Sequence, residues 1–116
     1  QTEYFNQHQV ECVKQAAALL TQELTVHRTI EQLAQEVGLS PTALKNCFKG
    51  IYRSSVYAYQ KEYRLQLAQK LLLETDCTVA EIAHRVGYEN PNKFSSAFRE
   101  AAGMTPTEYR KMRPIG

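Results

Sequence analysis

Two short stretches of the sequence place amide, amine and hydroxyl side chains at helical spacing directly after a proline. The Asn46 amide can form two hydrogen bonds with an adenine edge, the Thr42 methyl group can contact thymine, and Lys45 can reach guanine or phosphate. Side chains of these types and spacing suit the recognition of base pairs in a DNA groove. The candidate DNA-binding residues are Pro41, Thr42, Lys45, Asn46 and Lys49 in the first stretch, and Asn90, Asn92, Lys93, Ser96 and Arg99 in the second.

The candidates are expected to divide between bases and phosphates. Asn92, Lys93 and Ser96 occupy in the second stretch the outward positions that match those of the first. Arg99 is expected to contact phosphate, and the free backbone N–H groups at both helix starts can hold phosphates as well. For every candidate the alternative is an ordinary solvent-exposed side chain without a ligand.

The two stretches belong to a unit that occurs twice in the chain. TIEQLAQEVGL, residues 29–39, matches TVAEIAHRVGY, residues 78–88, at an offset of 49 residues, and after the shared glycine the offset becomes 50. A threonine followed three residues later by glutamine or glutamate predicts a capped helix start in each. Gly38 and Gly87 predict the helix ends, because glycine adopts the left-handed conformation without a Cβ penalty.

A second helix is predicted after each of these glycines. Ser40-Pro41 and Asn90-Pro91 provide a cap and then proline at the first helical position, where its missing N–H would have no partner in any case. Apolar residues at helical spacing follow and are predicted to be core. They are Leu44, Cys47, Phe48 and Ile51 in the first unit and Phe94, Ala97 and Phe98 in the second. Each unit is therefore predicted to be helix, turn, helix.

Three further helices follow from the same kinds of signal. They are predicted over about residues 7–24, over about residues 55–74 and from Thr105 onward. Phe5 is placed to pack against Val10 at the start of the first of them. Apolar residues at four-residue steps suggest a buried face of the long helix, formed by Tyr59, Tyr63, Leu67 and Leu71, with Leu65, Ala68 and Leu72 beside them.

The sequence therefore predicts an all-α fold with seven helices. Residues 1–54 form a first helix-turn-helix subdomain, residues 55–75 a long linker helix, and residues 76–116 a second helix-turn-helix subdomain. Such a unit binds DNA by laying its second helix in the major groove. One copy would be a moderate signal, because helical hairpins are common, but two copies in one small chain are a stronger one.

The length of the linker helix suggests how the two units would be used. A helix of about 20 residues spans ~30 Å, which is close to the ~34 Å between successive major-groove faces of B-DNA. The sequence thus predicts a monomer whose two units fill two successive major grooves of double-stranded DNA.

Two segments carry a family resemblance. TVAEIAHRVGYENPNKFSSAFREAAGMTPTEYRK, residues 78–111, resembles the signature of AraC/XylS-type bacterial transcription regulators nearly throughout, and RLQLAQKLLLET, residues 64–75, resembles their linker helix. The similarity covers about residues 8–112. It implies a sequence-specific transcription activator that binds double-stranded DNA, with RNA polymerase as a candidate partner. It also implies an upstream ligand-sensing or dimerisation domain, which is missing from this chain.

The chain departs from that family at three positions. Asn46 and Ser96 stand where the family often has arginine, so the first unit is expected to contact fewer guanines or to bind more weakly. Arg53 stands where the second unit has Gly103 and where the family usually has glycine. The turn at Arg53 must therefore tolerate a side chain or be strained.

The charges are unevenly distributed along the chain, although the net charge is only +2. Residues 1–44 carry two basic residues against five glutamates, and residues 45–116 carry twelve basic residues against seven acidic ones. A segregated basic region is a candidate polyanion-binding surface, although a solvated helix surface is the alternative. Its basic residues near the linker helix are Lys45, Lys49, Arg53, Lys61, Arg64 and Lys70, with Glu62 as the one acidic residue among them.

Other classes of function have less support. Cys12, Cys47 and Cys77 form no Cys-x-x-Cys pair, which argues against a disulfide framework or a zinc cluster and fits a reduced cytoplasm. Scattered histidines give no metal-ligand spacing, so we expect no metal and no cofactor. No apolar run has the ~18 residues needed to cross a membrane.

An enzyme and a protein-interaction module are the two alternatives to DNA binding. An enzyme would need converging titratable groups, and no such set is evident, so catalysis is not expected. The main alternative is a helical protein-interaction module. It would expose apolar residues on the two proline-led helices, where the sequence instead has Thr, Asn, Lys and Ser.

Overall fold

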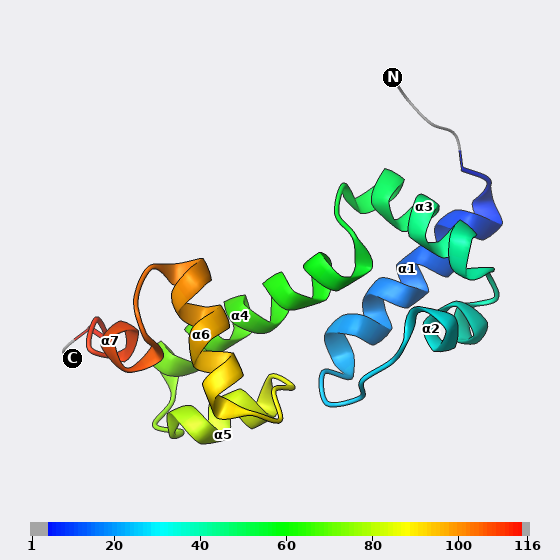
Figure 1. Cartoon of the computed structure of the whole chain (residues 1–116). Helices are drawn as coiled ribbons and strands as arrows, with labels where there is room; N and C mark the ends of the chain where they lie inside the picture. Colours follow the sequence, from blue (N-terminus) through cyan, green and yellow to red (C-terminus); the bar gives the residue numbers. More distant parts are fainter. Residues whose placement is uncertain (1–4, 115–116) are drawn as a thin grey trace. The chain divides into compact units, whose positions relative to one another are not determined.

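A computed structural model describes residues 5–114, and within that range it contains seven helices and no strand (Figure 1). The all-α fold predicted from the sequence is confirmed. The helices are α1 (Gln7–Gln22), α2 (Ile30–Val37), α3 (Pro41–Tyr52), α4 (Val56–Glu74), α5 (Val79–Arg85), α6 (Pro91–Ala102) and α7 (Pro106–Arg110).

The chain separates into two compact units, the first extending to Lys61 and the second beginning at Glu62. The first unit contains α1, α2, α3 and the start of α4, and the second contains the rest of α4 with α5, α6 and α7. The boundary therefore falls inside α4, a helix of 19 residues. The division into 1–54, 55–75 and 76–116 stays a prediction.

Local hydrogen bonds explain where the short helices begin. The Thr29 hydroxyl accepts from the Gln32 N–H at 3.1 Å and the Thr78 hydroxyl from the Glu81 N–H at 3.0 Å. The glutamine and glutamate side chains accept in return from the threonine backbone N–H groups. These bonds lower the pKa of Glu81, because the Thr78 backbone N–H stabilises its charged form. The predicted capping boxes are confirmed, and a further one opens α7 at Thr105.

The first unit closes around side chains from α1, α2 and α3. Val13, Ala16, Leu44 and Phe48 have no exposed surface, and Leu33 is 1% exposed. An aromatic cluster extends this core into α4, with ring centroids 4.9 Å apart for Phe48 and Tyr52, 5.2 Å for Phe48 and Tyr59, and 4.9 Å for Tyr52 and Tyr59. Burial raises the pKa of Tyr52. The core thus connects α3 to the start of α4.

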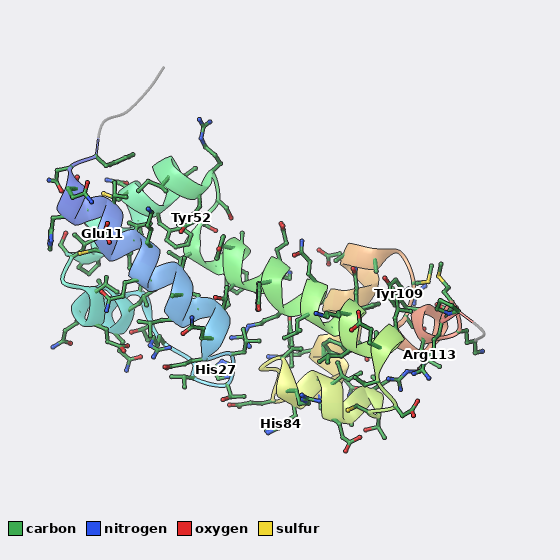
Figure 2. All side chains as sticks on the ribbon, turned by 180° about the vertical axis from the view of Figure 1, so that it is seen from behind. Glu11, His27, Tyr52, His84, Tyr109 and Arg113 are labelled. Atoms are coloured by element: carbon green, nitrogen blue, oxygen red, sulfur yellow. The ribbon has the colours of Figure 1, made fainter. Side chains whose placement is uncertain are left out.

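The second unit has its own aromatic core. Ring contacts at centroid distances of 5.5, 5.8 and 5.4 Å run in order through Tyr88, Phe94, Phe98 and Tyr109. Arginines from the last part of the chain fasten this core to α4: Arg110 donates to the Leu72 and Thr75 carbonyls, and Arg113 to the Asp76 carboxylate. Figure 2 labels Tyr109 and Arg113. The Arg110 bonds satisfy the Leu72 carbonyl in the last turn of α4 and the Thr75 carbonyl directly after it.

The row of apolar residues at four-residue steps on α4 packs against the cores except at Tyr63. Tyr63 is 37% exposed, and Leu67 and Leu71 are only partly buried. Two different cores use the helix: Val56 packs in the first unit, while Leu65, Ala68 and Leu72 pack in the second. The row at four-residue steps still contributes to both, since Tyr59 packs against the first core and Leu67 and Leu71 pack against the second.

The segment before α1 contacts α3. A Cβ atom built on Gly50 would lie 2.3 Å from Phe5 Cζ and 2.6 Å from Phe5 Cε2, so the Phe5 ring occupies the space that a side chain at Gly50 would fill. Phe5 is half-buried against the first core. The sequence suggested Val10 as the partner of Phe5, which stays a prediction, and did not suggest Gly50.

We expect the substitutions Gly50→Ala and Phe5→Ala to be strongly non-additive. Alanine is a better helix former than glycine by about 1 kcal/mol, so Gly50→Ala should stabilise a Phe5→Ala variant by about that amount. In the wild-type chain the new methyl group displaces the Phe5 ring, which should cancel the gain. Urea unfolding of the wild type, both single variants and the double variant should give a coupling of about 1 kcal/mol. Additive free energies would show that the ring does not pack against Gly50.

Candidate nucleic-acid interface

The two proline-led helices α3 and α6 begin in the same way. The Ser40 hydroxyl accepts from the Ala43 N–H at 3.1 Å, and the Asn90 side-chain oxygen accepts from the Asn92 N–H at 2.8 Å. Proline follows the cap in both helices. The caps decide at which residue each helix begins, and so which side chains form its first outward turn.

The helix before each of them ends in a matching turn. Gly38 has a φ of 85° and Gly87 a φ of 99°, both in the region that favours glycine. The residue after each glycine donates its N–H to a buried alanine five residues earlier, at 3.0 Å for Leu39 and 2.8 Å for Tyr88. The small side chains of these alanines leave room for the second helix of each unit.

The structure exposes all the candidate DNA-binding residues to solvent. The opposite face of the same helices is buried, with Leu44, Phe48, Phe94 and Phe98 showing no exposed surface and Cys47 3%. Of the predicted core residues, Ile51 and Ala97 are partly buried. Both helices are therefore amphipathic, and each presents one polar row to solvent. We call these rows the α3 polar row (Pro41, Thr42, Lys45, Asn46, Lys49) and the α6 polar row (Asn90, Asn92, Lys93, Ser96, Arg99).

The prediction that free N–H groups at both helix starts hold phosphates is wrong for α6. Asn90 accepts from the N–H groups of Asn92 and Lys93 through its side chain, and from that of Phe94 through its backbone carbonyl at 3.1 Å. Pro91 has no N–H, so the first turn of α6 offers no free backbone donor. An asparagine cap can satisfy two donors at once, which sequence spacing alone does not reveal.

Arg64 is not part of a basic surface, contrary to the charge pattern of the sequence. Its side chain is 8% exposed, its Nη1 donates to the Val86 carbonyl at 2.8 Å, and its guanidinium lies 6.0 Å from the centroid of the Tyr88 ring. Val86 caps the C-terminus of α5 and precedes Gly87. Arg64 therefore stabilises the helix-turn-helix of the second unit from within.

The other basic residues of that pattern remain accessible. Lys45, Lys49, Arg53 and Lys70 are exposed and Lys61 is half-buried. The sequence contains a signal that Arg64 differs from these exposed residues. It precedes Leu65 and lies four residues before Ala68, two apolar residues of α4 that are buried. A long side chain at such a position can bury its stem and still bond a carbonyl.

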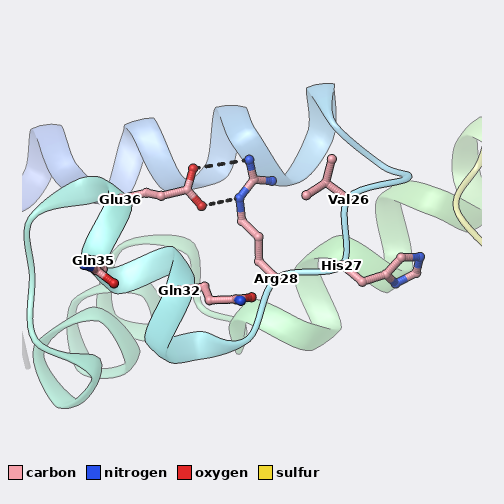
Figure 3. Close-up of a pocket in the computed structure, with 6 residues that line it drawn as sticks. All are labelled: Val26, His27, Arg28, Gln32, Gln35 and Glu36. Atoms are coloured by element: carbon pink, nitrogen blue, oxygen red, sulfur yellow. Dashed lines mark hydrogen bonds and ion pairs between the residues drawn. The ribbon is translucent and has the colours of Figure 1, made fainter.

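The first unit also contains a pocket of about 600 Å³ (Figure 3), and no residue of the α3 polar row lines it. It is lined by Val26, His27, Arg28, Gln32, Gln35 and Glu36. Arg28 donates to Glu36 at 2.5 Å and also to Glu23, and these bonds raise its pKa. Two carboxylates already neutralise this guanidinium, so the pocket offers no free positive charge to an anion.

Across residues 5–114, no three or more His, Cys, Asp or Glu side chains are grouped so that they could hold a metal ion. No helix in that range combines the length and apolar composition needed to cross a membrane.

Comparison with known proteins adds independent information. A family model described as a helix-turn-helix domain matches residues 33–112. A putative AraC-like transcription regulator of Streptomyces lividans is 36% identical over 83 residues, which are 72% of this chain and 27% of that protein. An HTH-type regulator of Bacillus subtilis matches at 30% identity, with only 12% of its length covered. The chain therefore corresponds to a small part of these relatives.

Solved structures share the fold. The C-terminal domain of AraT, a response regulator from Geobacillus stearothermophilus, has a TM-score of 0.84 and 32% sequence identity, covering 90% of this chain and 88% of that chain. The DNA-binding domain of AdpA, a global transcriptional factor solved with a target DNA, has a TM-score of 0.81 and 26% identity, covering 86% and 90%.

Proposed function

Because this chain belongs to the AraC-type family of helix-turn-helix transcription regulators, we propose that it binds double-stranded DNA sequence-specifically through α3 and α6, each in its own major groove. The observation that carries the proposal is the pair of amphipathic helices whose exposed faces are polar rows of amide, hydroxyl and basic side chains. Such rows match the donors and acceptors of base edges. The DNA complex of AdpA, a structural relative, supports it.

The two helices are proposed to occupy successive grooves. A helix of 19 residues such as α4 spans ~28 Å at ~1.5 Å per residue, which is comparable to one turn of B-DNA at ~34 Å. A single chain could then contact both half-sites without a partner copy.

Roles within the rows follow from side-chain chemistry. Asn46 and Asn92 are proposed to bond adenine edges, and Thr42 to contact a thymine methyl group. Lys45 is proposed to contact guanine or phosphate, Lys93 a base, and Arg99 phosphate. The backbone N–H of Thr42, which bonds no other residue within 5–114, is proposed to add a phosphate contact at the start of α3.

The rest of the regulator is also a matter for proposal. We infer an upstream ligand-sensing or dimerisation domain, because the relatives are several times longer than this chain. Activation of transcription in the cytoplasm of a bacterium, through contact with RNA polymerase, is the activity that such an assembly would support.

A helical protein-interaction module is the weaker candidate. The large apolar side chains exposed within residues 5–114 are Val26, Tyr57, Tyr63 and Met112. None of them lies on α3 or α6. A docking surface on those helices would lack the apolar anchors on which protein interfaces depend.

Selection of bound duplexes from a random oligonucleotide pool tests the proposed function. We expect one contiguous, asymmetric site with two clusters of conserved bases about 10 base pairs apart, because two unlike helices would enter adjacent major grooves. Recovery of no consensus would contradict sequence-specific binding. A single short cluster would contradict the use of both helices.

Repeating the selection with two α6 variants tests the division of roles. Asn92→Ala should relax preference at one base pair, with a discrimination loss of about 1–3 kcal/mol there, because an amide pair with a base edge is lost. Arg99→Ala should weaken binding to all sequences alike and leave the consensus unchanged, since a phosphate contact carries no base information. Uniform loss in both variants would contradict the assignment of Asn92 to a base.

A further inference from the structure

We propose that Arg53 is a further phosphate-binding residue of the first unit, placed at the end of the α3 polar row by a strained turn. The inference rests on the proposed function, because it requires α3 to lie in a DNA groove. It extends that function to a residue whose backbone conformation would favour glycine.

The conformation of Arg53 is unusual for an arginine. Its φ is 60° and its ψ 27°, in the left-handed region, and it caps α3 by donating its N–H to the Lys49 carbonyl at 2.9 Å. Within residues 5–114 it is the one residue other than glycine with a positive φ. The left-handed backbone conformation is unfavourable for residues with a Cβ atom. Arginine at this position therefore lowers the stability of the folded first unit relative to glycine.

In the second unit, glycine occupies the position in the turn that corresponds to Arg53. Gly103 caps α6 with a φ of 80° and donates its N–H to the Arg99 carbonyl at 2.8 Å. A Cβ atom at Gly103 would meet nothing within 4 Å. The turn therefore favours glycine for its backbone freedom and not for lack of space. Nothing about the fold of the first unit requires an arginine at this turn.

Position and charge indicate what Arg53 can bind. Arg53 follows the last residue of α3, four residues after Lys49, at the C-terminal end of the helix that carries the α3 polar row. Its side chain is exposed, and within the described chain no hydrogen bond or ion pair of its guanidinium is found. A helix in the major groove has phosphates beside its ends, and a guanidinium binds phosphate with paired hydrogen bonds.

The sequence around Arg53 carries positive charge and no negative charge. Lys49 lies one turn earlier on α3, and Lys61 on α4 has its Nζ 5.9 Å from the ring centroid of Tyr57, which is 73% exposed. No acidic residue occurs in the sequence between Glu36 and Glu62. A phosphate at the end of α3 would meet Arg53 and Lys49 and no carboxylate from this segment.

The substitution Arg53→Gly separates a DNA contact from a purely structural role, because the two predict different outcomes. Removing the strain should raise the urea midpoint of unfolding. Removing a phosphate contact should lower DNA affinity by about eightfold at about 0.1 M salt and reduce the salt slope by about 0.9. The loss should be equal for the selected duplex and an unrelated duplex. A more stable protein that binds DNA less well is the expected result.

Two further variants serve as matched comparisons. Arg53→Asn also removes the charge but tolerates the left-handed conformation, so it should lose the same affinity as Arg53→Gly. Lys14→Ala removes one charge from the exposed face of α1, outside the α3 polar row, and should leave the salt slope unchanged. Unchanged affinity and slope in both Arg53 variants would overturn the inference. Failure of the wild-type domain to bind any duplex would instead overturn the proposed function, and this inference with it.

Discussion

DNA affinity of this domain should fall by about 500-fold when monovalent salt rises from about 50 to about 200 mM. This fall corresponds to about five contacts with DNA phosphates. The exposed basic side chains available for them are Lys45, Lys49, Arg53, Lys93 and Arg99. Each neutralised phosphate releases condensed counterions and contributes about −0.9 to the slope of log affinity against log salt, giving about −4.5 in all. Because the whole chain carries only +2, this response would come from local charge.

Fluorescence anisotropy of a labelled duplex at a series of salt concentrations measures the slope. Asn92→Ala provides the control, because it removes a proposed base contact without removing a charge and should shift the line without changing its slope. A slope near zero would contradict the phosphate contacts and point to a protein partner for the same surface.

Arg64→Ala should lower the free energy of unfolding by about 2–4 kcal/mol, a larger effect than that of any exposed basic residue. The substitution leaves the buried Val86 carbonyl without the charged donor that now lies 2.8 Å away, and a hydrogen bond to a charged group is worth about 1.5–3 kcal/mol. The packing of the aliphatic stem is lost as well. The turn between α5 and α6 depends on this bond, so the loss should fall on the second unit.

Urea unfolding compares this variant with two others. Arg64→Lys keeps a positive donor and should recover part of the loss, because a lysine cannot reproduce the planar guanidinium. Lys70→Ala, at an exposed position of the same helix, should change stability by less than about 0.5 kcal/mol. Equal small effects for Arg64→Ala and Lys70→Ala would contradict the buried role of Arg64.

Most of the fold could be predicted because its signals are local. A capping threonine such as Thr78 bonds a residue three positions away, and the turn at Gly38 depends on the conformation of one residue. Such interactions join residues that are close together in the sequence, so they can be predicted without knowledge of the rest of the chain. Helix number and approximate bounds followed from them.

The exposure of the two polar rows could also be predicted. On an amphipathic helix the burial of Phe48 or Phe94 turns the polar side chains of the opposite face outward. Which DNA bases these side chains contact stays a prediction, since it depends on a molecule outside the chain.

The sequence by itself determined the seven helices, the repeated helix-turn-helix and the exposure of Asn46 and Asn92. Only the tertiary structure decided that Arg64 bonds Val86 and that the Phe5 ring lies against Gly50. These contacts join residues far apart along the chain. The periodicity of apolar residues does not show which distant segment packs on which face of a helix. Local hydrogen bonds and helical periodicity can be predicted from a sequence. The partner of a buried side chain cannot, because it depends on how separate helices pack together.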